Sequence, residues 1–477
     1  MSREYETVIG LEVHVELATK TKIFCGCSTA FGGAPNTHTC PVCTGMPGSL
    51  PVLNKQVVEY AMAVGLATNC TINQNCKFDR KNYFYPDNPQ NYQISQLYEP
   101  ICRNGGIEIE TADGTKKTIG IHEIHMEEDA GKLVHDDWDD VSIVDFNRSG
   151  VPLIEIVSEP DMRSADEVIA YLEKLRLIIQ YLGASDCKLN EGSMRADVNL
   201  SVREAGASEF GTRTEMKNLN SFRAIARAIE GEKNRQIDLI ESGEKVVQET
   251  RRWDDAKESS HAMRSKEDAQ DYRYFPEPDL VPIHISDEWL AEVKNRQPEL
   301  RTEKLARYES EYEIPRYDAE IITSSKRLAD IFEQTVAICG KPKKVSNWLM
   351  VETMRLLKER EMEPENIVFS PEHLAALVEL ADAGTINSTV AKEVFEHMFA
   401  DDTDPKQYVE EHGLKTVNDE GALRTTVEQV IRDNPQSVDD YHNGKEKAIG
   451  FLVGQTMKAM KGKANPGMVN QILKELL

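Results

Sequence analysis

The spacing of apolar residues changes once along this 477-residue chain. From the N-terminus to about residue 290, apolar and polar side chains alternate with a period of two, as in strands with one buried face. After about residue 287 the apolar residues recur at helical spacing, for example in 325–339, 345–359 and 371–382. Strand runs followed by helices predict an α+β fold, with a mostly antiparallel sheet preceding a helical region.

Two helices interrupt the predicted strands. The first follows a capping box, Ser164-x-x-Glu167, and stops at Gly183, while the second begins near Asn220 and ends near Gly243. A chain of this length is too long for one ordinary core and suggests about two to four domains. The changes of pattern predict boundaries near residues 290 and 405, and therefore three domains, 1–290, 291–405 and 406–477.

The charge balance limits the class of partner. The chain has 56 basic and 81 acidic residues, a net charge of −25, which disfavours non-specific binding to DNA. Residues 441–477 differ, because six lysines and two glutamates give them a charge of +4. The N-terminus has no apolar stretch of a secretory signal and no run could span a membrane. We therefore expect a cytoplasmic protein without membrane partners, the alternative being an organelle lumen after removal of a transit peptide. Nine cysteines in that compartment argue against a disulfide framework.

Four cysteines form two close pairs within 19 positions, and we predict that they bind zinc. Two thiol pairs on turn-like backbone suit four tetrahedral Zn–S bonds, and a closed set of four indicates a structural site. The alternative is four unrelated free thiols, and His38 is a possible substitute ligand. The predicted zinc ligands are Cys25, Cys27, Cys40 and Cys43, in a loop spanning 25–43.

A second candidate site lies on the predicted strand 7–17. Its polar face carries Glu12, His14 and Glu16, spaced about 6.5–7 Å apart along the strand. Further acidic residues follow in 125–129 and 145–155. Carboxylates with one histidine suit a hard cation, so the pattern predicts one or two Mg²⁺ ions carrying a nucleotide. A solvated sheet face explains the first strand equally well when it is taken alone.

Residues 77–96, KFDRKNYFYPDNPQNYQISQ, interleave basic and aromatic side chains. Such a segment can hold a phosphate chain and stack a base, or its aromatic rings can simply pack in an ordered loop, and the sequence leaves both open. Four further basic residues lie on polar strand faces, where phosphate would be favoured: Arg195, Arg203, Arg213 and Lys217. The chain lacks the phosphate-loop, dinucleotide and nucleophile-elbow motifs.

Several long motifs resemble one known family in the order in which they occur. They are VIGLEVHVEL, the segment 77–96, HMEEDAGK, DFNRSGVPLIEIVSEPD, EMKNLNSF, DYRYFPEPDL and GFLVGQTMKAMKGKANP. Together they span nearly the whole chain and are similar to the B subunits of bacterial aspartyl/glutamyl-tRNA amidotransferases. The resemblance implies a cradle domain, a helical domain and a small tail domain.

The resemblance also implies an activity. The family uses ATP and Mg²⁺ to phosphorylate the side-chain carboxylate of Glu on tRNA(Gln), or of Asp on tRNA(Asn), and ammonia then displaces the phosphate. Ammonia comes from a partner amidase (glutaminase) subunit, and a small third subunit completes a heterotrimer. A carboxylate is a poor acyl donor, whereas an acyl phosphate has a good leaving group, and Mg²⁺ neutralises the charge of the phosphoryl group.

The resemblance assigns roles by position. The catalytic residues and Mg²⁺ ligands are expected to be Glu12, His14, Glu128 and Glu155, with Glu16, Glu127 and Asp197 as further candidates. ATP or substrate phosphate is expected at Arg148, Arg203 and Lys217. The four cysteines match the zinc-bearing branch of the family. The tRNA contact is expected at Lys445, Lys447, Lys458, Lys461 and Lys463, although a solvated helix face would explain these lysines equally.

Two other functions fit the residues alone. Acidic strand faces with Mg²⁺ could hydrolyse RNA as a phosphohydrolase, and the acidic clusters could be solvated faces of a non-catalytic tRNA-binding scaffold. The first predicts RNA cleavage without ATP. The second predicts that replacing Glu12 or Glu128 by alanine leaves amide formation intact.

Overall fold

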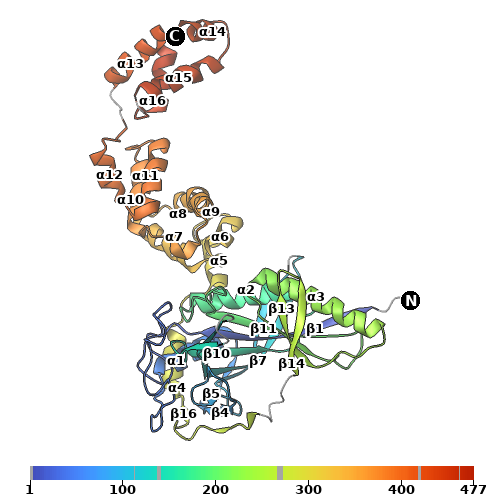
Figure 1. The fold of residues 1–477 in the computed structure, drawn as a ribbon. Helices are drawn as coiled ribbons and strands as arrows, with labels where there is room; N and C mark the ends of the chain where they lie inside the picture. The colour runs from blue at the N-terminus through green and yellow to red at the C-terminus, as the bar shows by residue number, and fades with distance from the viewer. Residues whose placement is uncertain (1–3, 112, 137–140, 266–271, 417–419, 461) are drawn as a thin grey trace. The chain divides into compact units, whose positions relative to one another are not determined.

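The computed structural model describes residues 4–111, 113–136, 141–265, 272–416, 420–460 and 462–477. The chain divides into two compact units, Met1–Leu300 and Arg301–Leu477 (Figure 1). The first is built on a mostly antiparallel sheet and the described part of the second contains only helices, which confirms the predicted fold class. The division into three domains stays a prediction.

A nine-stranded sheet forms the centre of the first unit. Neighbouring strands are antiparallel except for β12 and β13, which are parallel. In spatial order the strands are β14 (Ser259–Ser265), β13 (Glu249–Asp254), β12 (Thr214–Lys217), β11 (Met194–Glu204), β1 (Tyr5–Glu16), β10 (Pro152–Ser158), β7 (Lys116–Glu128), β6 (Cys102–Glu110) and β2 (Thr71–Ile72). The predicted strand at the N-terminus is thus the middle strand, between β10 and β11.

Three smaller sheets complete this unit. One has the order β15 (Phe275–Pro276), β4 (Asp79–Asn82) and β5 (Tyr92–Ser95); the others pair β16 (Ile283–His284) with β3 (Asn75–Cys76) and β8 (Lys132–Asp136) with β9 (Val141–Asp145). Strands β4 and β5 of the first of these sheets belong to the basic and aromatic segment 77–96, and β5 packs against β7.

The helices α1 (Lys55–Ala67), α2 (Ala165–Tyr181), α3 (Phe222–Glu241) and α4 (Asp287–Asn295) pack on these sheets or on one another. The predicted cap of α2 is confirmed, because the Ser164 side chain accepts from Glu167 N, and Gly183 has a φ of 68°; the Glu167 carboxylate accepts from Arg163 N rather than from Ser164 N. The helix predicted between Asn220 and Gly243 is also present, as α3. Helix α1 was not predicted, because its apolar residues are buried on several sides and show no single stripe.

The second unit contains α5 (Arg301–Ser310), α6 (Arg316–Ile322), α7 (Lys326–Cys339), α8 (Pro342–Asn347), a π-helical turn (Trp348–Thr353), α9 (Met354–Glu359), a 3-10 turn (Pro364–Asn366), α10 (Pro371–Asp382), α11 (Ser388–Asp401), α12 (Pro405–Glu411), α13 (Glu420–Asp433), α14 (Pro435–His442), α15 (Lys447–Ala459) and α16 (Pro466–Leu476). One hydrophobic cluster runs from Leu305 to Val409 and another from Leu423 to Leu473. Among the described residues, none of the helices is long and apolar enough to cross a membrane.

Candidate functional site

The polar side chains of β1 meet those of both neighbouring strands. In the register of the sheet, His14 lies opposite Glu155 of β10, and Glu12 lies opposite Asp197 of β11. Residues directly opposite one another in antiparallel strands project to the same face. Two acidic groups therefore form side by side on one face of the sheet, one around each residue of β1.

The first group, here called the His14 group, consists of His14, Glu127 and Glu155, with ligand atoms within 4.8 Å of one another. Nε2 of His14 lies 3.4 Å from the Glu155 carboxylate and 3.8 Å from that of Glu127. A second imidazole joins them, because Nε2 of His125 lies 3.1 Å from Glu155. Carboxylates and imidazole are donors that suit Mg²⁺ or Mn²⁺, so this group fits a divalent cation.

The charges of the His14 group stabilise one another. Burial disfavours a charged imidazole, but Glu155 and Glu127 outweigh it and raise the pKa of His14 to about 8. The pKa of His125 is raised for the same reason. Burial alone would raise the pKa of Glu155, yet the two imidazoles hold it well below its ordinary value. The group is therefore a carboxylate cluster that attracts positive charge.

The second group, here called the Glu12 group, consists of Glu12, Asp197 and Glu215, again with ligand atoms within 4.8 Å. Lys217 lies inside it, with Nζ 2.5 Å from Asp197 and 3.2 Å from Glu215. Thr250 of β13 donates to Glu215 at 2.8 Å and so fixes that carboxylate. Three carboxylates beside one lysine can hold a cation together with the oxygens of a phosphate.

Glu16 begins a third cluster further along β1. Its pKa is raised to about 8 by burial and by the neighbouring carboxylate of Asp129. Asp129 in turn is paired with Arg195 at 3.0 Å. Glu16 therefore interacts with the Asp129 carboxylate, whose charge Arg195 already neutralises. Glu16 belongs to neither the His14 group nor the Glu12 group.

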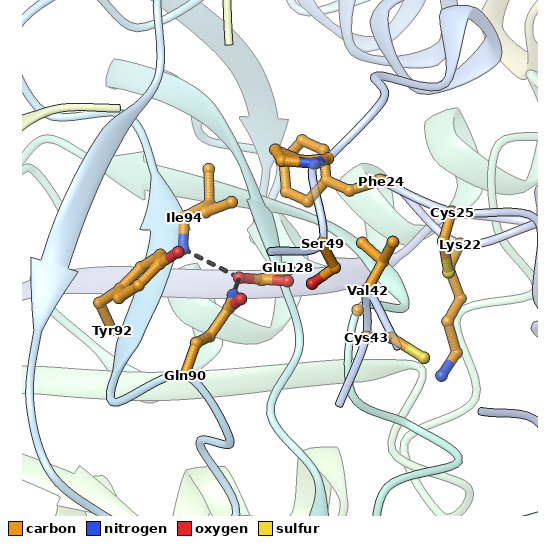
Figure 2. Close-up of a pocket in the computed structure, with 12 residues that line it drawn as sticks. Lys22, Phe24, Cys25, Val42, Cys43, Ser49, Gln90, Tyr92, Ile94 and Glu128 are labelled. Carbon is orange, nitrogen blue, oxygen red and sulfur yellow. Dashed lines mark hydrogen bonds between the residues drawn. The ribbon is translucent and has the colours of Figure 1, made fainter. Parts of the chain in front are cut away.

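Glu128 does not join either group. Successive side chains of a strand point to opposite faces, so Glu127 reaches the His14 group and Glu128 faces away from it. Figure 2 shows its carboxylate accepting from Gln90 Nε2 at 2.6 Å and Ile94 N at 3.1 Å. Burial raises the pKa of Glu128 to about 8. The structure thus brings Glu127, rather than Glu128, to His14 and Glu155.

The three residues expected to bind phosphate lie in three different places. Lys217 belongs to the Glu12 group, Arg203 pairs with Glu6 at 2.7 Å, and Arg148 donates to the main-chain oxygens of Ala130 and Gly131. Arg148 also lies 3.5 Å from Asp129 of the Glu16 cluster, so of the three only Lys217 lies within the Glu12 or the His14 group.

Segment 77–96 contributes one cation, Lys81, that interacts with the His14 group. Lys81 is half-buried, and although its desolvation disfavours the charge, Tyr274, Glu127 and Glu155 raise its pKa. Arg80, in contrast, is held by both oxygens of Glu277, at 2.6 and 2.9 Å. One basic residue of the segment thus faces the His14 group, and another is bound within the protein.

The four predicted zinc ligands lie together. The sulfurs of Cys25, Cys27, Cys40 and Cys43 are all within 4.8 Å of one another, and those of Cys40 and Cys43 are 3.9 Å apart. Zn–S bonds of about 2.3 Å in a tetrahedron separate sulfurs by roughly 3.8 Å, so the group fits zinc. A hydrogen bond from Cys25 lowers the pKa of Cys43 to about 4. His38 is not part of this group.

The lysines expected to contact tRNA lie on or near α15. Lys445, Lys447 and Lys458 are exposed, and Lys463 is half-buried. Lys445 pairs with Asp440 at 2.9 Å. Lys461 lies outside the described residues.

Sequence reasoning gave neither Glu215 nor His125 a role in the site. The sequence shows Glu215 alternating with Arg213 and Lys217 on a short strand. It does not show that this strand pairs with β11, which brings Glu215 opposite Asn199. His125 stands two residues before Glu127, at the spacing of one strand face. This two-residue spacing could have indicated that His125 shares a strand face with Glu127.

Two family models match the chain. One, described as the GatB/GatE catalytic domain, matches residues 7–291, and the other, described as a GatB domain, matches residues 330–477. Curated relatives are similar along their full length. The B subunit of the aspartyl/glutamyl-tRNA(Asn/Gln) amidotransferase of Agathobacter rectalis is 79% identical over 475 residues, 100% of both chains. The B subunits of the same name in Lachnospira eligens and Caldicellulosiruptor saccharolyticus are 75% and 60% identical, over 100% and 99% of both chains.

Proposed function

The chain belongs to the family of aspartyl/glutamyl-tRNA(Asn/Gln) amidotransferase B subunits, and we propose that the polar face of β1 is its ATP-dependent site. The resemblance of the sequence motifs is confirmed by this membership. The chain is one component of an amidotransferase, a carbon–nitrogen ligase of protein biosynthesis, and this replaces the phosphohydrolase and scaffold alternatives.

The proposed reaction forms Gln-tRNA(Gln), Asn-tRNA(Asn) or both in two steps. ATP first phosphorylates the side-chain carboxylate of the misacylated amino acid, and ammonia then displaces phosphate to leave the amide. Mg²⁺, when bound, supplies neutralising charge for the phosphoryl group. The chain's own contribution is to position both substrates and to exclude water from the acyl phosphate.

The observation that carries the proposal is the adjacency of the two acidic groups. Glu12 and His14 are separated by one residue on β1, so the groups lie about 6.5–7 Å apart, a spacing that a triphosphate chain can bridge. We assign one Mg²⁺ to each group. We propose that Lys217 and Lys81 pair with phosphate oxygens at the Glu12 and His14 groups respectively; the contact of Lys217 with Asp197 and the effect of Glu127 and Glu155 on the pKa of Lys81 support this.

The remaining assignments follow from the family. We propose a structural zinc ion at the four cysteines, tRNA contact through the lysines of the tail, and ammonia supply from an amidase (glutaminase) partner in a cytoplasmic heterotrimer that also holds a small third chain. The four-cysteine geometry supports the first of these assignments, and the positive charge of 441–477 supports the second.

The test follows labelled Glu on tRNA(Gln) in the assembled complex with ATP, Mg²⁺ and ammonium. We expect labelled Gln after deacylation with the unmodified chain and none with Glu155→Gln. Glu108→Gln, an exposed change on β6, is the matched control and should leave the yield unchanged. If Glu155→Gln forms the amide as fast as the unmodified chain does, the His14 group takes no part in the reaction.

A further inference from the structure

Lys22 precedes the cysteine loop 25–43 and is completely buried, with an exposed fraction of 0%. Lysine is almost never fully buried unless a partner balances its charge. Its ammonium donates to the main-chain oxygen of Phe146 at 3.2 Å, and this carbonyl carries no net charge. Among the residues that the structure describes, no carboxylate forms an ion pair with Lys22. The balancing charge therefore has to come from another kind of group.

The cysteine group lies beside this ammonium. Lys22 lines a small pocket together with Cys25 and Cys43, and Figure 2 shows its side chain extending past Cys25 towards Cys43. A methyl group on Gly150 would lie 3.5 Å from Cβ of Cys43 and 3.6 Å from Cδ of Lys22, so both side chains pack around the same glycine. Besides the hydrogen bond from Cys25, the Cys43 thiolate receives one from the Lys22 ammonium. A buried cation thus contacts a predicted zinc ligand.

Main-chain contacts hold the lysine in this position. Lys22 N donates to the main-chain oxygen of Cys27 at 3.0 Å, so the lysine lies across from the first cysteine pair. Ser149 Oγ donates to the main-chain oxygen of Cys43 at 3.0 Å, which joins the second cysteine pair to the turn 146–151. The ammonium is therefore held between the cysteine loop and the turn that leads into β10.

A zinc ion bound by four thiolates needs such a cation. Each cysteine binds as a thiolate, so the four sulfurs carry more negative charge than the ion carries positive charge. Removing this excess charge from water costs free energy unless hydrogen bonds or a cation balance it. Groups that hydrogen-bond to metal ligands also orient them and increase the affinity for the metal. A buried ammonium next to one of the thiolates does both.

We propose that Lys22 is a positioning residue of the zinc site, whose ammonium donates to the Cys43 thiolate and balances part of the negative charge of the zinc–thiolate cluster. The lysine does not bind the ion itself. Through Phe146 it also ties the cluster to the turn before β10, the strand that carries Glu155. The inference rests on the zinc ion assigned under the proposed function and adds to that site a residue outside the four cysteines.

The alternative is that Lys22 only fills space. Methionine has a similar length and would fill the same space without charge, so in this case zinc would bind as before. Lost packing would also lower the thermal midpoint equally with and without zinc. A lysine that balances the cluster should instead contribute more to the stability of the zinc-loaded chain than to that of the stripped chain.

The test measures the zinc affinity of the full-length chain in its complex by competition with a chromophoric chelator. Lys22→Met should weaken zinc binding by about 10- to 100-fold, as is typical of partners of metal ligands. Lys22→Gln, which keeps a donor but has no charge, should also weaken it, and it replaces Lys22→Met if that variant does not fold. Lys20→Met changes an exposed lysine two positions earlier, and this matched control should bind zinc like the unmodified chain.

Cobalt(II) in place of zinc gives a spectroscopic measurement of the same contact. A hydrogen bond to a thiolate lowers the energy of the sulfur lone pair. Its loss in Lys22→Met or Lys22→Gln should therefore move the sulfur-to-cobalt charge-transfer band to longer wavelength, whereas Lys20→Met should leave the band in place. A residue that only fills space would not change the energy of this transition.

Three outcomes would overturn the inference. They are an unchanged zinc affinity in the Lys22 variants, an unchanged charge-transfer band, and an equal loss of thermal midpoint with and without zinc. If the unmodified chain binds no zinc, the zinc assignment itself fails, and this result is distinct from the other three.

Discussion

His14 and Glu155 face each other across β1 and β10, with Nε2 of the imidazole 3.4 Å from the carboxylate. The two residues are 141 positions apart in the chain, and only the pairing of the strands brings them together. Because Glu155 is also 3.1 Å from Nε2 of His125, one carboxylate serves two imidazoles. The protonation of this group should therefore depend strongly on Glu155.

We expect Glu155→Gln to lower the pKa of His14 in the metal-free protein. Glu155 contributes most to raising this pKa to about 8 against the effect of burial, so its removal should bring the value down toward the ordinary 6.5, while Glu127 and Asp197 still raise it. Histidine proton resonances titrated by NMR measure the change. Glu159→Gln, whose carboxylate contacts His122, should leave the His14 titration unchanged. An unaltered pKa in Glu155→Gln would contradict the contact.

Glu215 and Glu128 should differ in their effect on nucleotide binding. Glu215→Gln removes one of three carboxylates of the Glu12 group, and we expect at least about a tenfold loss of Mg·ATP affinity, as for other metal-site changes. Glu128→Gln lies on the opposite face and should change this affinity less than about twofold. Titration calorimetry with Mg·ATP measures the affinity of both variants. A larger loss of affinity in Glu128→Gln than in Glu215→Gln would indicate that Glu128 is the metal ligand.

Glu128→Gln should also stabilise the protein at alkaline pH. The pKa of this carboxyl is raised from 4.5 to about 8 in the folded chain. Between these values the unfolded chain has released a proton that the folded chain retains, so the free energy of unfolding falls as pH rises. Glutamine removes this penalty and can still accept from Gln90 and Ile94.

The thermal midpoint of Glu128→Gln should therefore exceed that of the unmodified chain by at least about 2 °C at pH 8.5, and by less at pH 5. Calorimetric scans at both pH values measure the difference. A gap that does not change with pH would show that Glu128 is ionised throughout this range.

The cysteine group should bind one zinc ion. We expect about one equivalent in freshly purified protein, and its loss with a lower thermal midpoint in Cys40→Ser, because four thiolates complete the coordination. Cys339→Ser, outside the group, is the matched control and should retain zinc. Elemental analysis is the measurement, and zinc retained at full occupancy in Cys40→Ser would contradict the assignment.

The lysines of α15 should affect tRNA affinity through salt dependence. Each phosphate contact contributes about one to the slope of log affinity against log salt concentration, so Lys447→Ala with Lys458→Ala should reduce the slope by about two. Lys474→Ala, also exposed but on α16, serves as the control. Filter binding over a range of salt concentrations measures this, and an unchanged slope would indicate a solvated face.

Much of the fold followed from local pattern. The alternation along 7–17 predicted β1 and the shared face of Glu12 and His14, because a strand projects every second side chain to one side. The capping residue Ser164 and the stop at Gly183 predicted α2 in the same way. The close spacing of the cysteine pairs also predicted their cluster, since each pair is brought together by a few residues of backbone.

What the sequence could not determine is which distant residues share a group. Glu215 joins Glu12 because β12 lies beside β11 and β11 beside β1, and strand order depends on the packing of the whole sheet. Glu127 rather than Glu128 joins His14 because a shift of one residue in a strand reverses every side chain. Local periodicity identifies the candidate side chains, but only the tertiary register between strands decides which of them meet.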